Sequence, residues 1–171
     1  MKLRLIEPTP RLADEYEAFL RDFRADGSVD YALPPDDGTD VLTLIRRLRN
    51  CADGLDLPNG WVPWTTFWLV SEDERLLGQA SLRHRLTPAL EDFGGHIGYG
   101  IRPGERKMGF GTVLLELVLQ KARDLGLERV LLTCDPANVG SARIIQKNGG
   151  RLMTESASFH GRMTSRYEIF L

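Results

Sequence analysis

The sequence of 171 residues has few of the features that mark several large protein classes. Its two cysteines, Cys51 and Cys134, are too few for a disulfide scaffold, so we expect a reducing, cytoplasmic environment. No uncharged apolar run approaches the length of a membrane span, and the N-terminal MKLRLIEPTP lacks the long apolar core of a secretion signal. Repeats and low-complexity tracts are also missing. We therefore expect one globular domain that binds no membrane.

The chain also lacks a strong charge excess. A formal net charge of -2 argues against a dedicated nucleic-acid-binding protein, which usually has a large basic surplus. The charge is uneven, however, because residues 1–60 carry 8 Lys/Arg and 12 Asp/Glu. Five aspartates and no basic residue lie between Asp26 and Asp40. Such a stretch could hold a cationic substrate near an anionic cofactor, although a solvated loop is the simpler interpretation.

Hydrophobic residues make up 42% of the chain, which is typical of a globular protein. Residues 1–60 predict a strand at Lys2–Ile6, a helix at Pro10–Ala25 capped by Thr9, and a second helix capped by Asp40. The predicted strands of the remaining part are Thr65–Val70, Leu76–Arg85, Gly95–Ile101, Arg129–Cys134, Arg151–Ser156 and Met163–Leu171. Its predicted helices are Phe110–Leu125 and Asn138–Asn148.

This order of elements predicts a mixed α+β, or α/β, fold in a single domain over residues 1–171. Residues 95–135 form a strand–helix–strand unit, whereas the other strands are better explained by antiparallel pairing. We expect a mixed central sheet of about six to seven strands flanked by about four helices. Residues 65–171 would form its core, and residues 1–60 would shape one side of a site.

The segment from Ile101 to Thr112, I-R-P-G-E-R-K-M-G-F-G-T, lies between a predicted strand and a predicted helix. Gly109 and Gly111 remove side chains where that helix begins, so its free N–H groups and positive dipole end would face outward. Arg106 and Lys107 would add cationic donors at the rim. The segment therefore predicts an anion site that suits a pyrophosphate.

Other phosphate loops and catalytic motifs do not match. Gly104 and Gly109 have P-loop spacing, but Phe110-Gly111 follows in place of Gly-Lys-Ser/Thr. No glycine trio fits the dinucleotide fingerprint, and no nucleophile elbow is present. The three histidines are too scattered in the sequence to predict a metal site.

The pattern Arg106-x-x-Gly109-x-Gly111 resembles the acetyl-CoA pyrophosphate loop of the GCN5-related N-acetyltransferase (GNAT) superfamily. Pro103, three residues before the arginine, fits the same pattern. The segment from Asn138 through Ser141-Ala142-Arg143 to Lys147-Asn148-Gly149 resembles the last conserved helix of that family. The resemblance covers residues 65–171 and extends to an uncharacterised bacterial branch of predicted acetyltransferases.

The resemblance implies an enzyme that moves an acetyl group from acetyl-CoA directly to a primary amine of a small molecule or peptide. It implies parallel strands, 95–101 and 129–134, that splay at their C-terminal ends and admit the pantetheine arm of the cofactor. A homodimer through the last strands is expected by analogy. The implied cofactor-binding residues are Tyr99, Ile101, Arg106, Lys107, Met108, Gly109, Phe110, Gly111, Thr112, Asn138 and Ser141.

The implied catalytic residues are His96 and Tyr99. We expect His96 to be the base that deprotonates the amine, since an imidazole is near half-protonated at neutral pH; a hydrogen-bonding role in the sheet is its alternative. Glu91 and Asp92 are other candidates for the base. His84 and Cys134 are expected to have structural roles.

The chain departs from the family at Ile145, where a tyrosine usually protonates the leaving thiolate. Tyr99, Tyr167, Cys134, Ser141 or a water molecule could replace that tyrosine. The departure also favours a second hypothesis, a non-catalytic module that binds acetyl-CoA for sensing or regulation. Trp61 and Trp64 could line an acceptor pocket, with a cationic amine on a ring face.

Overall fold

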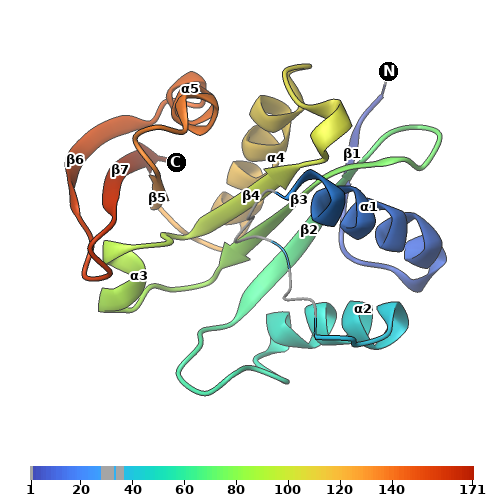
Figure 1. Ribbon diagram of the computed structural model, residues 1–171. Coiled ribbons are helices and arrows are strands. Elements are labelled where there is room, and N and C mark those ends of the chain that lie inside the picture. Colours follow the sequence, from blue (N-terminus) through green and yellow to red (C-terminus); the bar gives the residue numbers. More distant parts are fainter. Residues whose placement is uncertain (1, 28–32, 34–36) are drawn as a thin grey trace.

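The computed structural model of the chain describes residues 2–27, 33 and 37–171 (Figure 1). Its strands are β1 (Arg4–Ile6), β2 (Trp64–Val70), β3 (Leu76–Arg83), β4 (Ile97–Ile101), β5 (Arg129–Cys134), β6 (Arg151–Ala157) and β7 (Met163–Phe170). Its α-helices are α1 (Ala13–Asp26), α2 (Val41–Asn50), α3 (Pro88–Asp92), α4 (Phe110–Asp124) and α5 (Val139–Lys147). This arrangement confirms the mixed α+β class predicted from the sequence.

The strands form two antiparallel sheets. The first has the order β1-β2-β3-β4, and the second has the order β5-β7-β6. The sequence predicted one central sheet, whereas here the hydrogen-bonded ladder is interrupted between β4 and β5. These two strands face each other where the sheets meet, to the left of the centre in Figure 1.

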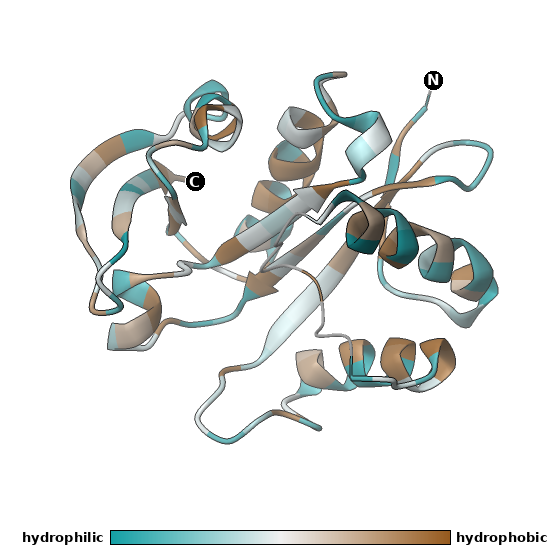
Figure 2. Cartoon of the chain, viewed as in Figure 1, coloured by the Kyte–Doolittle hydropathy of each residue, from teal (hydrophilic) through white to brown (hydrophobic). Residues whose placement is uncertain are grey.

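Helices cover both faces of the first sheet, as Figure 1 shows. Leu114, Leu115 and Val118 of α4 pack on one face in a core that extends to β5 and β7. Helices α1 and α2 pack on the other face around Trp68. In Figure 2, hydrophobic and hydrophilic segments alternate along α1, α2 and α4, which is the pattern of helices with one buried face.

Side-chain caps fix several helix starts. The Asp40 carboxylate accepts a hydrogen bond from the backbone N–H of Thr43 (2.9 Å), as predicted. The helix predicted from Pro10 begins with one 3-10 turn, Pro10–Leu12, before α1. Helix α3 was not predicted, although its Thr87-Pro88 start repeats the signal of Thr9-Pro10.

None of the helices in the described ranges combines the length and apolar character that crossing a membrane would require. Among the same residues, no three His, Cys, Asp or Glu side chains are grouped so that they could hold a metal ion. Asp30 and Asp36 of the acidic stretch lie outside the described residues.

Candidate active site

The parallel strands β4 and β5 meet at a single point, just before β4 begins. The backbone N–H of His96 donates to the carbonyl of Leu131 (2.7 Å), and the N–H of Leu131 donates to Nδ1 of His96 (2.9 Å). In the described part of the chain no other backbone hydrogen bond joins these strands. The sheets are therefore joined at His96 and open beyond it, as the predicted splay requires.

Gly95 allows this close approach. Its backbone has φ +62°, and a Cβ atom there would lie 2.3 Å from the carbonyl oxygen of Leu131. Only glycine combines this backbone conformation with this lack of volume. The junction is thus built into the sequence immediately before β4.

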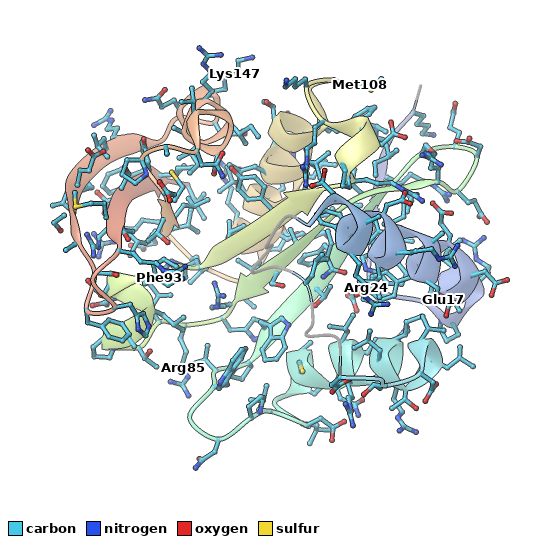
Figure 3. The ribbon with its side chains drawn as sticks, viewed as in Figure 1. Glu17, Arg24, Arg85, Phe93, Met108 and Lys147 are labelled. Carbon is cyan, nitrogen blue, oxygen red and sulfur yellow. The ribbon has the colours of Figure 1, made fainter. Side chains whose placement is uncertain are left out.

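A cleft of about 510 Å³ fills the opening between the two strands. It is lined by β4, by the end of β5 and by the start of α5, with Arg83, Phe93 and Met163 at its borders. Figure 3 shows Phe93 between the start of β4 and the β6–β7 hairpin. Of the predicted site residues, the cleft brings together Tyr99, Asn138 and Ser141.

One edge of β4 faces this cleft and pairs with no strand among the described residues. The N–H of Arg102 donates to Leu77 of β3 (2.9 Å), so alternate residues of β4 point toward β3. By that alternation the N–H and C=O groups of Tyr99 and Ile101 point toward the cleft. This arrangement agrees with the prediction that these two residues offer edge hydrogen bonds, although the Ile101 carbonyl also accepts from Arg106 Nε (3.1 Å).

The loop before α4 is the predicted anion site. Lys107 and Gly109 have left-handed backbones, with φ +64° and +89°, and a Cβ at Gly109 would meet nothing within 4 Å. Among the described residues, the N–H groups of Lys107 through Gly111 donate to no carbonyl. Met108 stands out from this loop into solvent (Figure 3). Free amides around open space at the start of a long helix fit a diphosphate.

Three residues of this loop differ from the prediction. The N–H of Thr112 already donates to the carbonyl of Gly109 (3.1 Å), so it belongs to the helix rather than to the free amides. Arg106 does not stand at the rim, since its guanidinium pairs with Asp26 (2.9 Å) and lies over the ring of Phe23. It therefore anchors the loop to α1.

Gly111 is needed for packing rather than for access to the anion site. A Cβ at this position would lie 2.5 Å from Cδ1 of Ile144 on α5. The absent side chain lets α5 approach α4, which brings Asn138 and Ser141 to the cleft. The sequence predicted a cofactor-binding role for Gly111, and the structure adds this packing contact to it.

Tyr99 and Ser141 face each other across the cleft. The Tyr99 hydroxyl lies 2.9 Å from the Ser141 hydroxyl, and the N–H of Ser141 donates to the Asn138 side chain (3.0 Å). Asn138 thus caps α5 and positions Ser141. The hydroxyl pair connects the two walls of the cleft, and each member can donate or accept a proton.

His96 does not occupy the position expected of a base. The residue is 9% exposed, its Nδ1 already accepts a hydrogen bond from the N–H of Leu131, and it lines a cavity separate from the cleft. Burial lowers the pKa of His96 to about 4, with smaller contributions from Arg129 and Arg83. The geometry corresponds to the alternative interpretation, in which the ring hydrogen-bonds in the sheet.

The other candidates have identifiable structural contacts. His84 Nε2 lies 2.9 Å from the Thr65 hydroxyl, and Asp92 pairs with Arg166 (2.5 Å). Burial raises the pKa of the Cys134 thiol, which keeps it protonated at the cleft wall. Ile145, at the position of the family tyrosine, is fully buried against Gly150.

A second cavity of about 600 Å³ adjoins the first sheet on the side of α2. Trp61 and Trp64, which the sequence suggested for an acceptor pocket, line it with ring centroids 5.6 Å apart. Arg83 lines both cavities. Sequence reasoning missed Arg83, although Gln79, Ser81 and Arg83 alternate with apolar residues and so mark one polar face of β3.

Comparison with protein families places these features in a known class. Residues 2–151 match the family model described as an acetyltransferase (GNAT) domain. The chain therefore belongs to the GNAT acetyltransferase family, whose acetyl donor is acetyl-CoA. A search of proteins with curated functions finds no match.

Solved structures with the same fold support this assignment. RimJ of Mycobacterium smegmatis, in complex with CoA-disulfide, has a TM-score of 0.70 and 19% identity over 98% of this chain and 81% of its own. The microcin C7 self-immunity acetyltransferase MccE, in complex with acetyl-CoA and AMP, has a TM-score of 0.71 and 14% sequence identity. The match covers 99% of this chain and 93% of MccE. A GNAT-family acetyltransferase of Streptococcus pneumoniae has a TM-score of 0.65 and 16% sequence identity. The match covers 99% of this chain and 100% of that protein.

Proposed function

We propose that this protein is an acetyl-CoA-dependent N-acetyltransferase that moves the acetyl group directly to a primary amine. The observation that carries the proposal is one continuous arrangement. The free amides of residues 107–111 lead to the open edge of β4 and its cleft, and this cleft shares Arg83 with a second cavity large enough for an acceptor. A donor site and an acceptor site that share one wall are what direct transfer needs.

The residues present suit the cofactor. The amides from Lys107 to Gly111 would bind its pyrophosphate, and the backbone edge of Tyr99 would bind its pantetheine arm. Asn138 would add a side-chain hydrogen bond at the mouth of the cleft. When bound, acetyl-CoA supplies an activated acetyl thioester. The protein's contribution is to hold the amine beside this thioester in a cleft with little water.

Proton transfer requires two groups of the protein. The attacking amine must be neutral, and Asp135 is the only carboxylate among the described residues that line the cleft. We assign the removal of the amine proton to Asp135 through water. Tyr99 and Ser141 would return a proton to the leaving thiolate through their 2.9 Å contact. This pair would replace the tyrosine that the family usually has at the position of Ile145.

The buried Ile145 favours a second candidate function, a non-catalytic acetyl-CoA-binding module. A homodimer remains a further proposal, supported by the exposed Leu152, Met153 and Phe170 of the second sheet. Light scattering tests the dimer independently of activity.

The test of activity is amine-dependent release of free thiol from acetyl-CoA, with mass spectrometry of the amine. An enzyme releases one thiol for each acetylated amine, and Ser141→Ala combined with Tyr99→Phe should lower this rate by about 10²-fold, the usual contribution of a general acid. Binding of acetyl-CoA without thiol release across a broad amine panel would favour the sensing module instead.

A further inference from the structure

Arg83 lies at the junction of the two cavities. It is the last residue of β3 and pairs in register with Trp64 of β2, so the two side chains are neighbours on the face that α1 and α2 cover. It lines the acceptor cavity together with Trp64 and also borders the cleft between β4 and β5. Among the described residues, Arg83 is the one that lines both cavities.

The charge of Arg83 is not compensated within the described residues. Its Nη1 donates to the carbonyls of Gly94 (3.2 Å) and Gly95 (2.9 Å), but no carboxylate lies within 4.0 Å of it. Burial lowers the pKa of this guanidinium, which is the sign of a desolvated cation. Desolvated charges in proteins are usually paired, so a half-buried arginine that has no carboxylate partner and lies beside a cavity points to an anionic ligand.

Arg47 on the opposite wall is different. It lies 3.6 Å from Asp37 and donates to the Thr39 hydroxyl (3.1 Å), and its side chain is 49% exposed. Its charge is thus already matched at the rim. Asp56 on the same wall accepts a hydrogen bond from Asn50 (2.7 Å). Arg83 is therefore the cation at which an incoming anion would gain most.

The remaining walls of the acceptor cavity are apolar. Leu44, Leu48 and Pro58 face it together with the two tryptophans. Between this cavity and the cleft lies the pair of Ser81 on β3 and Gly98 on β4. Gly98 lines the cleft and has no side chain of its own that would separate it from Ser81 in the second cavity.

We infer that the acceptor of this acetyltransferase is a free apolar amino acid, or a close analogue that carries a carboxylate beside its primary amine. The carboxylate pairs with Arg83, the apolar side chain lies against Trp64 and Leu48, and the amine extends over Gly98 into the cleft. This inference rests on the proposed function. The amide N–C bond forms, the thioester C–S bond breaks, and the amine proton ends on the released thiol.

A peptide N-terminus fits this arrangement less well, because its first carboxyl group is an amide and leaves the guanidinium without a partner. The cost of losing a charge-assisted hydrogen bond is large enough to discriminate between the two acceptors, roughly 10- to 100-fold in kcat/KM. Acceptors that differ only in this group therefore give a direct test.

The experiment measures kcat/KM for leucine and tryptophan against leucinamide, tryptamine and a leucine-headed peptide amide. We expect the amino acids to be preferred by at least about tenfold. Arg83→Gln should remove that preference, lowering kcat/KM for the amino acids at least about tenfold more than kcat/KM for leucinamide. Arg85→Gln, an exposed arginine beyond the end of β3 that lines neither cavity, is the matched control (Figure 3). A purely structural role of Arg83 would lower all rates together and would not change their ratio.

Calorimetric titration of leucine and tryptophan into the CoA-saturated protein provides a readout that needs no turnover. Binding that Arg83→Gln abolishes and Arg85→Gln preserves supports the inference, even if no acetyl transfer occurs and the transferase proposal fails. Equal or faster acetylation of leucinamide or the peptide overturns the inference while the transferase proposal stands. Failure of both amino acids to bind or react also overturns it.

Discussion

Single residues at the junction of the two sheets decide whether the cleft exists. His96 was expected to act as a base, yet its ring supports the backbone of Leu131 and lies outside the cleft. The hydrogen bond from the Leu131 N–H requires a neutral imidazole, because Nδ1 must be unprotonated to accept it. Its role is therefore to hold the sheets together, and its titration should affect stability rather than catalysis.

This role predicts a pH dependence of stability. Since the pKa of His96 is lowered to about 4 from 6.5, the unfolded chain binds a proton between these values that the folded protein excludes. Stability from this group is present above pH 6.5 and is lost as the pH falls toward 4. The His96→Asn variant has no titrating group at this position. As the pH falls over this range, its free energy of unfolding should therefore decrease by about 1–2 kcal/mol less than that of the wild type, allowing for solvent screening.

Urea unfolding at pH 7 and at pH 4.5 measures this difference. The rate of acetyl transfer in the His96→Asn variant should keep the pH profile of the wild type between pH 6 and 9. A profile that loses a basic limb in this variant would restore His96 as the catalytic base.

Arg102 shows the limit of sequence reasoning for single residues. It precedes the anion loop, and nothing in its local sequence predicts that it is buried. The structure buries it to 3% exposure and pairs it with Glu15 (2.5 Å) and Asp22 (2.6 Å) of α1. Contacts between residues about 80 positions apart cannot be read from local spacing.

Contacts between elements set the width of the cleft. Helix α5 carries Asn138 and Ser141, and its distance from α4 is fixed where Ile144 packs into the space over Gly111. The sequence predicted both helices and the glycine. It could not predict this contact, because the side-chain volume that the glycine must leave free is on another element.

Gly111→Ala should destabilise the protein by about 1–3 kcal/mol through overpacking against Ile144, which exceeds the gain in helix propensity. Ile144→Val removes the atom that lies 2.5 Å from the added methyl group. The double variant should therefore recover most of the loss. Thermal unfolding of the two single variants and the double variant measures this coupling, and strictly additive losses would disprove the contact.

The same reasoning explains which elements were predicted well. Strand β5 and the bounds of α4 agree with the sequence to within one residue, because their apolar residues follow a regular period. The separation into two sheets was not foreseen. It depends on Gly95 and on the two hydrogen bonds between His96 and Leu131, which leave no periodic signal in the sequence.

For the whole molecule, the sequence identified the family from one loop and one helix start, and the fold and the family comparison confirm it. The acceptor side was less predictable. It is assembled mainly from β2, β3, α2 and the segment before β2, and the sequence analysis had singled out only its two tryptophans and the acidic stretch that contains Asp37. The polar face of β3, which ends at Arg83, becomes meaningful only when the position of the cleft is known.

The central claim is that the loop before α4 and the cleft beside it bind acetyl-CoA, and calorimetric titration tests it directly, with NAD and ATP as controls. We expect one site per chain for acetyl-CoA alone, and roughly 2.7 kcal/mol of added stability at 100 times the dissociation constant.

Gly109→Glu should abolish this binding, because it places a side chain and a negative charge in the open space of the loop. Gly126→Glu, at the other end of α4 with φ +84° and equally open surroundings, is the matched control. Each of the two substitutions should lower the free energy of unfolding by about 1–2 kcal/mol, because a non-glycine residue is strained at positive φ. Binding lost in the first variant and kept in the second is the predicted result. No acetyl-CoA binding by the wild type, or undiminished binding by Gly109→Glu, would contradict the account.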